Sequence, residues 1–207
     1  MLRAPLPVHA WPKRLPQALA DLRGAQGLAV IGITTAPTAS RAQARHAIRH
    51  ALQNTLAAFL DQPLASIILL SSPGRPVQVQ MQTPGPPVYV AISHMPGMSV
   101  AAIHARGAVG VDVMAVSTQS LPDWAVVARN YLGPTAAAAL QNTPPDQRSM
   151  VFARAWTSNE ARLKCLGLGL TEWTPDVVLR LHGCTTVPLA LPAGSCGILA
   201  LQPTATD

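Results

Sequence analysis

Glu160 and Lys164 place a carboxylate and an amine one helical turn apart in the second half of the chain. At about 100° per residue, Phe152, Trp156 and Leu163 form one apolar stripe, and Glu160 falls on its edge, partly removed from water. A solvated Glu/Lys pair of this spacing contributes about 0.2–0.5 kcal/mol to helix stability, and that structural role stays open. Because the chain has only two glutamates, we expect another group to compensate this carboxylate.

Asp112 has the second unusual setting, because it lies inside the apolar run 109–114, which is typical of a strand. A buried carboxylate without a partner costs more free energy than folding can spare. It therefore needs a cation, a metal ion or several hydrogen-bond donors. A structural aspartate, satisfied at a β-bulge, is the alternative.

Polar and basic side chains also stand where elements begin or end. Ser93 and His94 follow the predicted strand 88–92 and are expected in a loop, which is a common place for site residues, although a lone loop histidine is usually solvated. Arg41 and Arg45 open a predicted helix, where free N–H groups also favour anions. An ordinary basic surface turn explains these two arginines equally well.

Composition narrows the class of protein. With 207 residues, of which 49% are hydrophobic and 12% charged, the chain can bury a real core. No apolar run approaches the length of about 18 residues that spans a membrane, so we expect no membrane partner. Three cysteines without CxxC spacing indicate neither a disulfide framework nor a zinc site.

A net charge of +6 favours an acidic partner. The basic residues form no run and are not interleaved with aromatic side chains, so we expect no nucleic-acid partner. A nucleic-acid binder remains an alternative on charge alone, and its affinity would fall steeply with salt. Residues 1–17 carry four prolines and no secretory apolar core, which favours a flexible start and a cytoplasmic protein. Basic residues without an acid in this segment leave a transit peptide conceivable.

Hydrophobic periodicity predicts an α+β protein in which each half has a long helix followed by strands. The predicted helices are 41–60, 121–131, 134–141 and a long helix that 143–146 caps and that stops at Gly167 and Gly169. The predicted strands are 28–35, 67–70, 77–81, 88–92, 99–103, 109–114, 177–181, 186–189 and 197–201. On the long helix, Arg154, Ser158, Arg162 and Cys165 are predicted to face away from the apolar stripe.

Several short motifs, taken together, resemble one family. Gly110-Val111-Asp112-Val113 and the stretch 156–164 (WTSNEARLK) resemble the two signatures of the 4′-phosphopantetheinyl transferase superfamily. Ile92-Ser93-His94 is similar to its S-H loop, and Gly74-Arg75-Pro76 is similar to its G-K/R-P turn. The chain length resembles the two-lobed, monomeric, surfactin-synthetase-activating type. This implies two similar lobes related by a pseudo-twofold axis, each a long helix packed on a small antiparallel sheet, over residues 1–105 and 106–207.

The resemblance implies transfer of 4′-phosphopantetheine from coenzyme A to a serine of an apo acyl or peptidyl carrier protein, with Mg²⁺ and release of adenosine 3′,5′-bisphosphate. It implies Asp112 and Glu160 as metal ligands in the C-terminal lobe. Glu160 would also accept the serine proton, and Lys164 would contact a phosphate oxygen. The coenzyme-binding residues that it implies are Arg75, Ser93, His94, Lys164 and Arg45, with Arg41 or Arg49 as further candidates for the 3′-phosphate.

Two positions depart from the family pattern. Met114 stands where many relatives carry a second acid, and Asn159 stands where a lysine usually precedes the glutamate. Both departures leave Asp112 and Glu160 intact, so we expect activity. The alternative is a catalytically impaired protein of the same fold that binds the coenzyme or the carrier.

Overall fold

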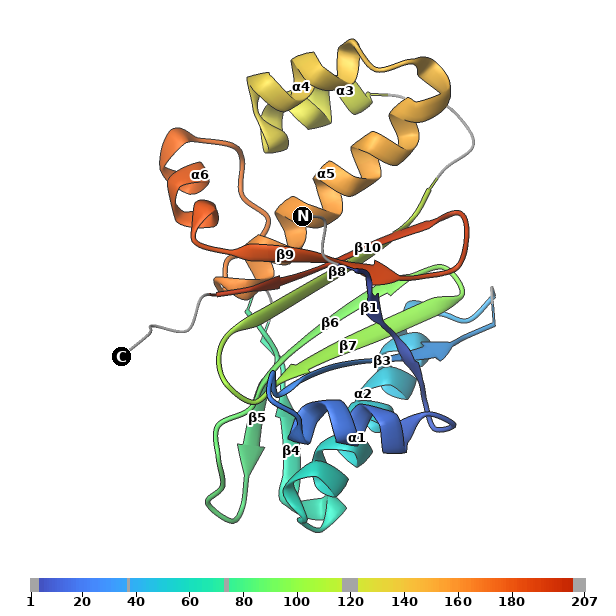
Figure 1. Cartoon of the computed structure of the whole chain (residues 1–207), viewed down its shortest axis with the longest axis vertical. Coiled ribbons are helices and arrows are strands. Elements are labelled where there is room, and N and C mark those ends of the chain that lie inside the picture. The colour runs from blue at the N-terminus through green and yellow to red at the C-terminus, as the bar shows by residue number, and fades with distance from the viewer. Residues whose placement is uncertain (1–3, 37, 73–74, 117–122, 203–207) are drawn as a thin grey trace.

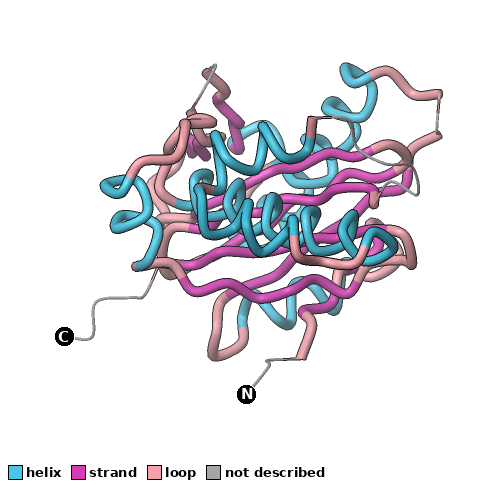
Figure 2. The backbone as a smooth tube through the Cα atoms, turned by 90° about the horizontal axis from the view of Figure 1, so that it is seen from above, coloured by secondary structure: helices cyan, strands magenta, loops and turns pink. Residues whose placement is uncertain are grey.

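Two four-stranded sheets lie side by side with helices outside them (Figures 1 and 2). The structure is a computed structural model that describes residues 4–36, 38–72, 75–116 and 123–202. The first sheet has the order β2-β3-β7-β6 and the second has the order β1-β9-β10-β8. The strands are β1 Leu6–Pro7, β2 His9–Ala10, β3 Leu28–Thr34, β4 Ile67–Leu70, β5 Gln78–Met81, β6 Tyr89–Met95, β7 Met98–His104, β8 Val109–Ala115, β9 Thr185–Ala190 and β10 Ser195–Leu201.

The helices cover the outer faces of these sheets. In Figure 1, α1 and α2 lie below the first sheet, whereas α5 lies above the second and carries α3 and α4 on its far side. The helices are α1 Leu15–Arg23, α2 Arg41–Leu60, a 3₁₀ turn at Leu64–Ser66, α3 Trp124–Val127, a π-helix at Ala128–Leu132, α4 Pro134–Gln141, α5 Pro145–Cys165 and α6 Pro175–His182. These elements confirm the predicted α+β class. Within the described residues, no helix has the length and apolarity needed to cross a bilayer.

The two sheets repeat one strand arrangement. In the first, β7 pairs antiparallel with both β3 and β6, and in the second β10 pairs antiparallel with both β8 and β9. Alternate side chains of β8, from Val109, Val111 and Val113, join residues of β3 and β7 in one apolar cluster that both sheets share. The opposite face of β8 therefore turns toward α5, and Asp112 lies on that face.

Helix α5 is anchored by its small residues rather than by its aromatic stripe. Ala153, Thr157 and Ala161 are buried, and Ala161 packs in one cluster with Ala200 of β10. Phe152 and Trp156 instead stack on each other and pack against α3 and α4. This rotation also buries Cys165, so the prediction that Cys165 faces away from the core is wrong.

The structure corrects the predicted cap of α5. The helix begins at Pro145, inside the segment 143–146 that is predicted to cap it, and ends just before Gly167, which has a positive φ of 68°. The Thr143 side chain, however, donates to the Ala139 carbonyl oxygen, and α5 has no side-chain cap. Asp146, in the first turn, instead places a negative charge at the positive end of the helix dipole, which stabilises the start of the helix.

Other element predictions also need correction. The segment 177–181 lies in helix α6 and not in a strand, because the Thr174 hydroxyl caps the helix by accepting from the Val177 N–H at 3.2 Å. Ser93 and His94 lie inside β6, which continues to Met95, and not in a loop. The predicted helix 121–131 becomes α3 and the following π-helix, and its first two residues lie outside the described part.

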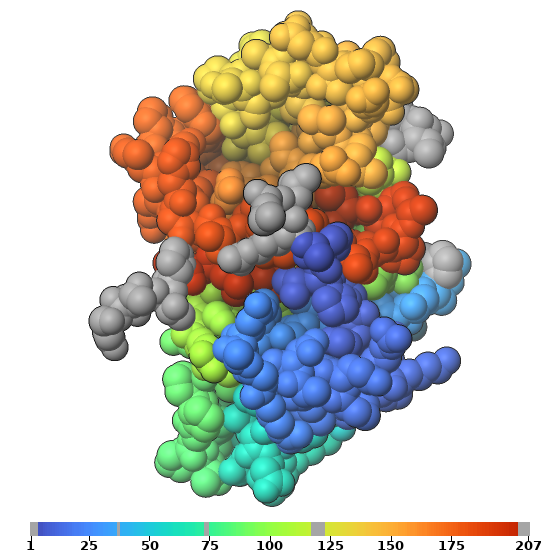
Figure 3. All heavy atoms as spheres, viewed as in Figure 1, coloured from blue at the N-terminus to red at the C-terminus, as the bar shows by residue number. Residues whose placement is uncertain are grey.

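The chain start is structured over residues 6–10 and from Leu15, so a flexible segment over 1–17 is wrong there. Strand β2 pairs parallel with β3 of the first sheet, and β1 pairs parallel with β9 of the second. Figure 3 shows this blue segment on the surface where it meets the red C-terminal strands. The His9 side chain adds a 2.7 Å contact to Asp21 of α1. The chain start thus connects both sheets.

Candidate active site

A cleft of about 840 Å³ opens where α2, β6, β8 and α5 meet. It brings together residues that are far apart in the sequence. Every site residue that the sequence predicts lies in its lining: Arg45, Arg75, Ser93, His94, Asp112, Glu160 and Lys164. Gly74 of the predicted G-R-P turn lies outside the described residues.

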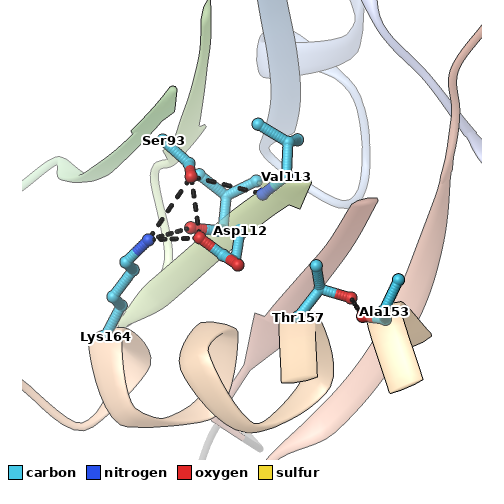
Figure 4. A network of polar contacts seen from close by, with 7 residues as sticks. Ser93, Asp112, Val113, Ala153, Thr157 and Lys164 are labelled. Carbon is cyan, nitrogen blue, oxygen red and sulfur yellow. Dashed lines mark hydrogen bonds and ion pairs between the residues drawn. The ribbon is translucent and has the colours of Figure 1, made fainter. Parts of the chain in front are cut away.

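A polar network surrounds Asp112, which lines this cleft together with Ser93 and Lys164 (Figure 4). The Lys164 ammonium donates to Asp112 Oδ1 at 2.6 Å and to the Val111 carbonyl oxygen at 3.2 Å. The Ser93 hydroxyl donates to the same Oδ1 at 2.7 Å and accepts from the Val113 N–H at 3.2 Å. Asp112, which is only 8% exposed, therefore has both a cation and a neutral donor. These contacts meet the requirement for compensation that its apolar strand predicts.

Gly110 allows α5 to approach β8 closely enough for this ion pair. A Cβ at this position would lie 2.5 Å from the Cys165 backbone nitrogen and closer still to the Ala161 carbonyl oxygen. Both atoms belong to the backbone of α5 and cannot rotate away. The glycine two residues before Asp112 thus sets the distance between the strand that carries Asp112 and the helix that carries Lys164.

Glu160 lines the cleft one turn before Lys164. Burial raises the pKa of its carboxyl group, the nearby Lys164 ammonium lowers it, and the Asp112 carboxylate raises it again. The net pKa lies above the ordinary value. A carboxylate with a raised pKa is a better proton acceptor when ionised, which suits a general base.

Arginines form the other side of the cleft, on α2 and beside β5. Arg49 donates to the Ser71 hydroxyl at 2.6 Å and to the Leu69 carbonyl oxygen, so its guanidinium fixes the end of β4. The guanidinium groups of Arg41 and Arg45, also on α2, make no hydrogen bond or ion pair to any described residue, and both residues line the cleft. All three predicted arginines of α2 thus line the cleft, but Arg49 is held by β4 and the residue after it, whereas no described residue binds the guanidinium groups of Arg41 and Arg45.

His94 lines the same cleft and is close enough to Arg41, Arg45 and Lys164 to feel their charges. Its Nδ1 lies 2.8 Å from the Ser99 hydroxyl oxygen, and Ser99 is completely buried. Sequence reasoning missed Ser99, although the signal was present: His94 and Ser99 are paired across the β6–β7 hairpin. Burial lowers the pKa of His94 to about 4, helped by the charges of Arg45, Arg41 and Lys164.

The His94 ring should therefore stay neutral at physiological pH. We expect its resonances in NMR to titrate near pH 4, and Arg45→Ala to move the midpoint upward because the first of the three cationic neighbours is gone. Arg106→Ala is the control, because Arg106 acts on His104 and not on His94; this substitution should leave the midpoint of His94 unchanged. Unfolded chains take up this proton near pH 6.5, so His94 destabilises the fold progressively as the pH falls from about 6.5 to 4. A midpoint at 6.5 or above would contradict this environment.

The residues present fit a small divalent cation that is shared with a ligand. The described residues contain no group of three or more His, Cys, Asp or Glu side chains placed to hold a metal. Asp112 and Glu160 nevertheless line one cleft, and Met114 lines it beside them. Mg²⁺ is commonly bound by one or two carboxylates, with substrate phosphates and water as further ligands. A pair of carboxylates beside arginines that suit phosphates matches that donor set.

Comparison with protein families gives a match in the second half of the chain. Residues 108–188, from just before β8 into β9, match the family model of the 4′-phosphopantetheinyl transferase superfamily. No curated protein matches the chain. The matched segment contains Asp112, Glu160 and Lys164, which meet in the cleft. Over this segment the chain is similar to the 4′-phosphopantetheinyl transferase superfamily, and the match supports phosphopantetheinyl transfer as the general class of reaction.

Proposed function

We propose that the protein transfers 4′-phosphopantetheine from coenzyme A to a serine of an apo acyl or peptidyl carrier protein and releases adenosine 3′,5′-bisphosphate. The observation that carries the proposal is the meeting of Asp112 and Glu160 in one cleft that arginines also line. The carboxylates come from β8 and α5, so the fold has to bring them together.

Coenzyme A fits this cleft by its charge. Its pyrophosphate and 3′-phosphate are anionic groups that guanidinium side chains bind well. Arg41 and Arg45 line the cleft from α2, and Arg75 lines it near Glu160 and Lys164 of α5; these three arginines are our candidates for the phosphates of the coenzyme. His94 is neutral and adjoins them, so it can hydrogen-bond to a phosphate oxygen without a charge of its own.

The reaction that we propose exchanges one phosphorus–oxygen bond for another. The serine oxygen of the carrier forms a bond to the phosphorus that bears pantetheine. The bond from that phosphorus to the bridging oxygen breaks, and adenosine 3′,5′-bisphosphate leaves with the electron pair. Glu160 accepts the serine proton, directly or through water, because its carboxylate is half-buried in the cleft with a raised pKa.

Asp112 and Glu160 would hold Mg²⁺, which supplies positive charge to the pyrophosphate oxygens when bound. In the absence of ligand, Lys164 balances the charge of Asp112. Its ammonium is partly exposed at the cleft, so it is placed to contact a phosphate oxygen as well. We propose the two-lobed, monomeric, surfactin-synthetase-activating type, with lobes over residues 1–105 and 106–207 and a cytoplasmic location.

The test is transfer to a panel of apo carrier proteins from fatty-acid, polyketide and peptide synthases. Each carrier is incubated with the protein, coenzyme A and Mg²⁺, and its intact mass is measured. We expect at least one carrier to gain a single phosphopantetheine on serine. Unmodified carriers throughout would contradict transfer. If coenzyme A binds tightly in the same samples, that result would favour the impaired coenzyme- or carrier-binding protein that Met114 and Asn159 suggest.

A further inference from the structure

Ser93 occupies the place where the two sheets meet without backbone pairing. It lies in β6, the edge strand of the first sheet, opposite β8, the edge strand of the second. The side chain is buried, with 5% exposed. Its hydroxyl bonds both to the backbone of β8, at Val113, and to the side chain of Asp112. Figure 4 shows the hydroxyl between the two strands.

The hydrogen-bonding capacity of this hydroxyl is already filled by the protein. A serine hydroxyl has one proton to donate and two lone pairs to accept with. The proton is donated to Asp112 Oδ1 at 2.7 Å. The lone pairs accept from the Val113 N–H at 3.2 Å and from the Lys164 ammonium at 3.4 Å. No donor remains for a phosphate oxygen of the coenzyme.

The contacts also fix one side of the Asp112 carboxylate. Among the described residues, the hydrogen bonds to this carboxylate, from Ser93 and Lys164, both end on Oδ1. The Lys164 ammonium is mobile in principle, because it ends a flexible chain that is 30% exposed. Ser93 is short, buried and held by a backbone N–H, so its hydrogen bond is the rigid one of the two.

We infer that Ser93 is a positioning residue, which orients the Asp112 carboxylate for cation binding and joins the edges of the two sheets, rather than a coenzyme ligand. The role of Ser93 in transfer rests on the proposed function. The coupling of Ser93 to Asp112 does not depend on that function. Oδ2 of Asp112 is then the oxygen presented to a divalent cation.

The test compares cation binding and coenzyme binding in three variants. Mn²⁺ binding to the coenzyme-free protein is measured by electron paramagnetic resonance, and coenzyme A binding by calorimetry without metal. Ser93→Ala should weaken Mn²⁺ binding about tenfold or more, as is typical for partners of a metal ligand, and leave coenzyme binding within about twofold. Ser93→Thr keeps the hydroxyl and should restore most of the Mn²⁺ affinity. Ser99→Ala removes a buried hydroxyl from the same hairpin, beside His94, and should leave Mn²⁺ affinity unchanged.

A second measurement does not depend on metal or on activity. Melting temperatures are compared for Ser93→Ala, Asp112→Asn and the double variant. If Ser93 holds Asp112, the melting temperature of the double variant should fall by less than the sum of the decreases in the two single variants. Additive losses, or a Ser93→Ala protein that keeps its Mn²⁺ affinity but loses coenzyme affinity, would overturn the inference. Weakened Mn²⁺ binding with non-additive melting, in a protein that modifies no carrier, would uphold the positioning role and reject the proposed transfer.

Discussion

Replacing Glu160 with glutamine is expected to slow transfer to the carrier serine by about 10²–10⁴-fold, the usual contribution of a positioned general base. Glutamine keeps the size and the hydrogen-bonding shape of the side chain but cannot take up the proton. It also removes one of the two carboxylates that line the cleft, so cation affinity should fall as well. Half-burial in the cleft raises the pKa of this carboxyl group, which favours its role as the proton acceptor.

The chain offers a matched control, because its other glutamate, Glu172, is exposed and does not line the cleft. Glu172→Gln makes the same chemical change and should leave the transfer rate within about twofold of wild type, since surface substitutions have small effects. Both rates are measured by the intact mass of the carrier in a single turnover. Equal rates for Glu160→Gln and Glu172→Gln would remove Glu160 from the mechanism.

Gly110→Ala is expected to lower the free energy of unfolding by about 3 kcal/mol, at the upper end of the usual cost of overpacking. The new methyl group would overlap the backbone of α5 at Ala161 and Cys165. Helix α5 can relieve this overlap only by moving away from β8. That movement would lengthen the contact between Lys164 and Asp112, so transfer should be impaired along with stability.

Gly183→Ala is the control for this substitution. Gly183 has a φ of −69°, which alanine adopts readily, and a Cβ there would lie 3.9 Å from the Arg180 carbonyl oxygen, an ordinary contact distance. The Gly183→Ala substitution should change the free energy of unfolding by less than about 1 kcal/mol. Urea unfolding followed by circular dichroism measures both variants. A Gly110→Ala protein as stable as Gly183→Ala would show that β8 and α5 are not held at the close distance on which the site depends.

Elements with strong local signals could be predicted from the sequence. Helix α2 runs over the predicted residues 41–60, and the Ser40 cap with its Gln43 partner explains why its start is so definite. The need of Asp112 for compensation also follows from the sequence, because the cost of a buried charge does not depend on the details of the fold.

Features that depend on contacts between distant segments could not be predicted. The apolar pattern of 177–181 suits a strand or a helix, and the Thr174 cap decides for the helix. Cys165 is buried because the face of α5 that carries the small residues, and not the face with the aromatic stripe, packs on the second sheet. Ser93 has the sequence context of a ligand residue, but its hydroxyl bonds within the protein because β6 and β8 lie side by side.

The claim that Asp112 and Glu160 act at one centre is tested most directly by single-turnover transfer in wild type, Asp112→Asn, Glu160→Gln and the double variant, with intact mass of the carrier as the readout. Residues that act as a unit give non-additive losses. We predict that each single variant is strongly impaired and that the double variant is little slower than the slower single variant. A double variant that loses the product of the two single losses, or an Asp112→Asn protein that transfers at the wild-type rate, would contradict a shared centre.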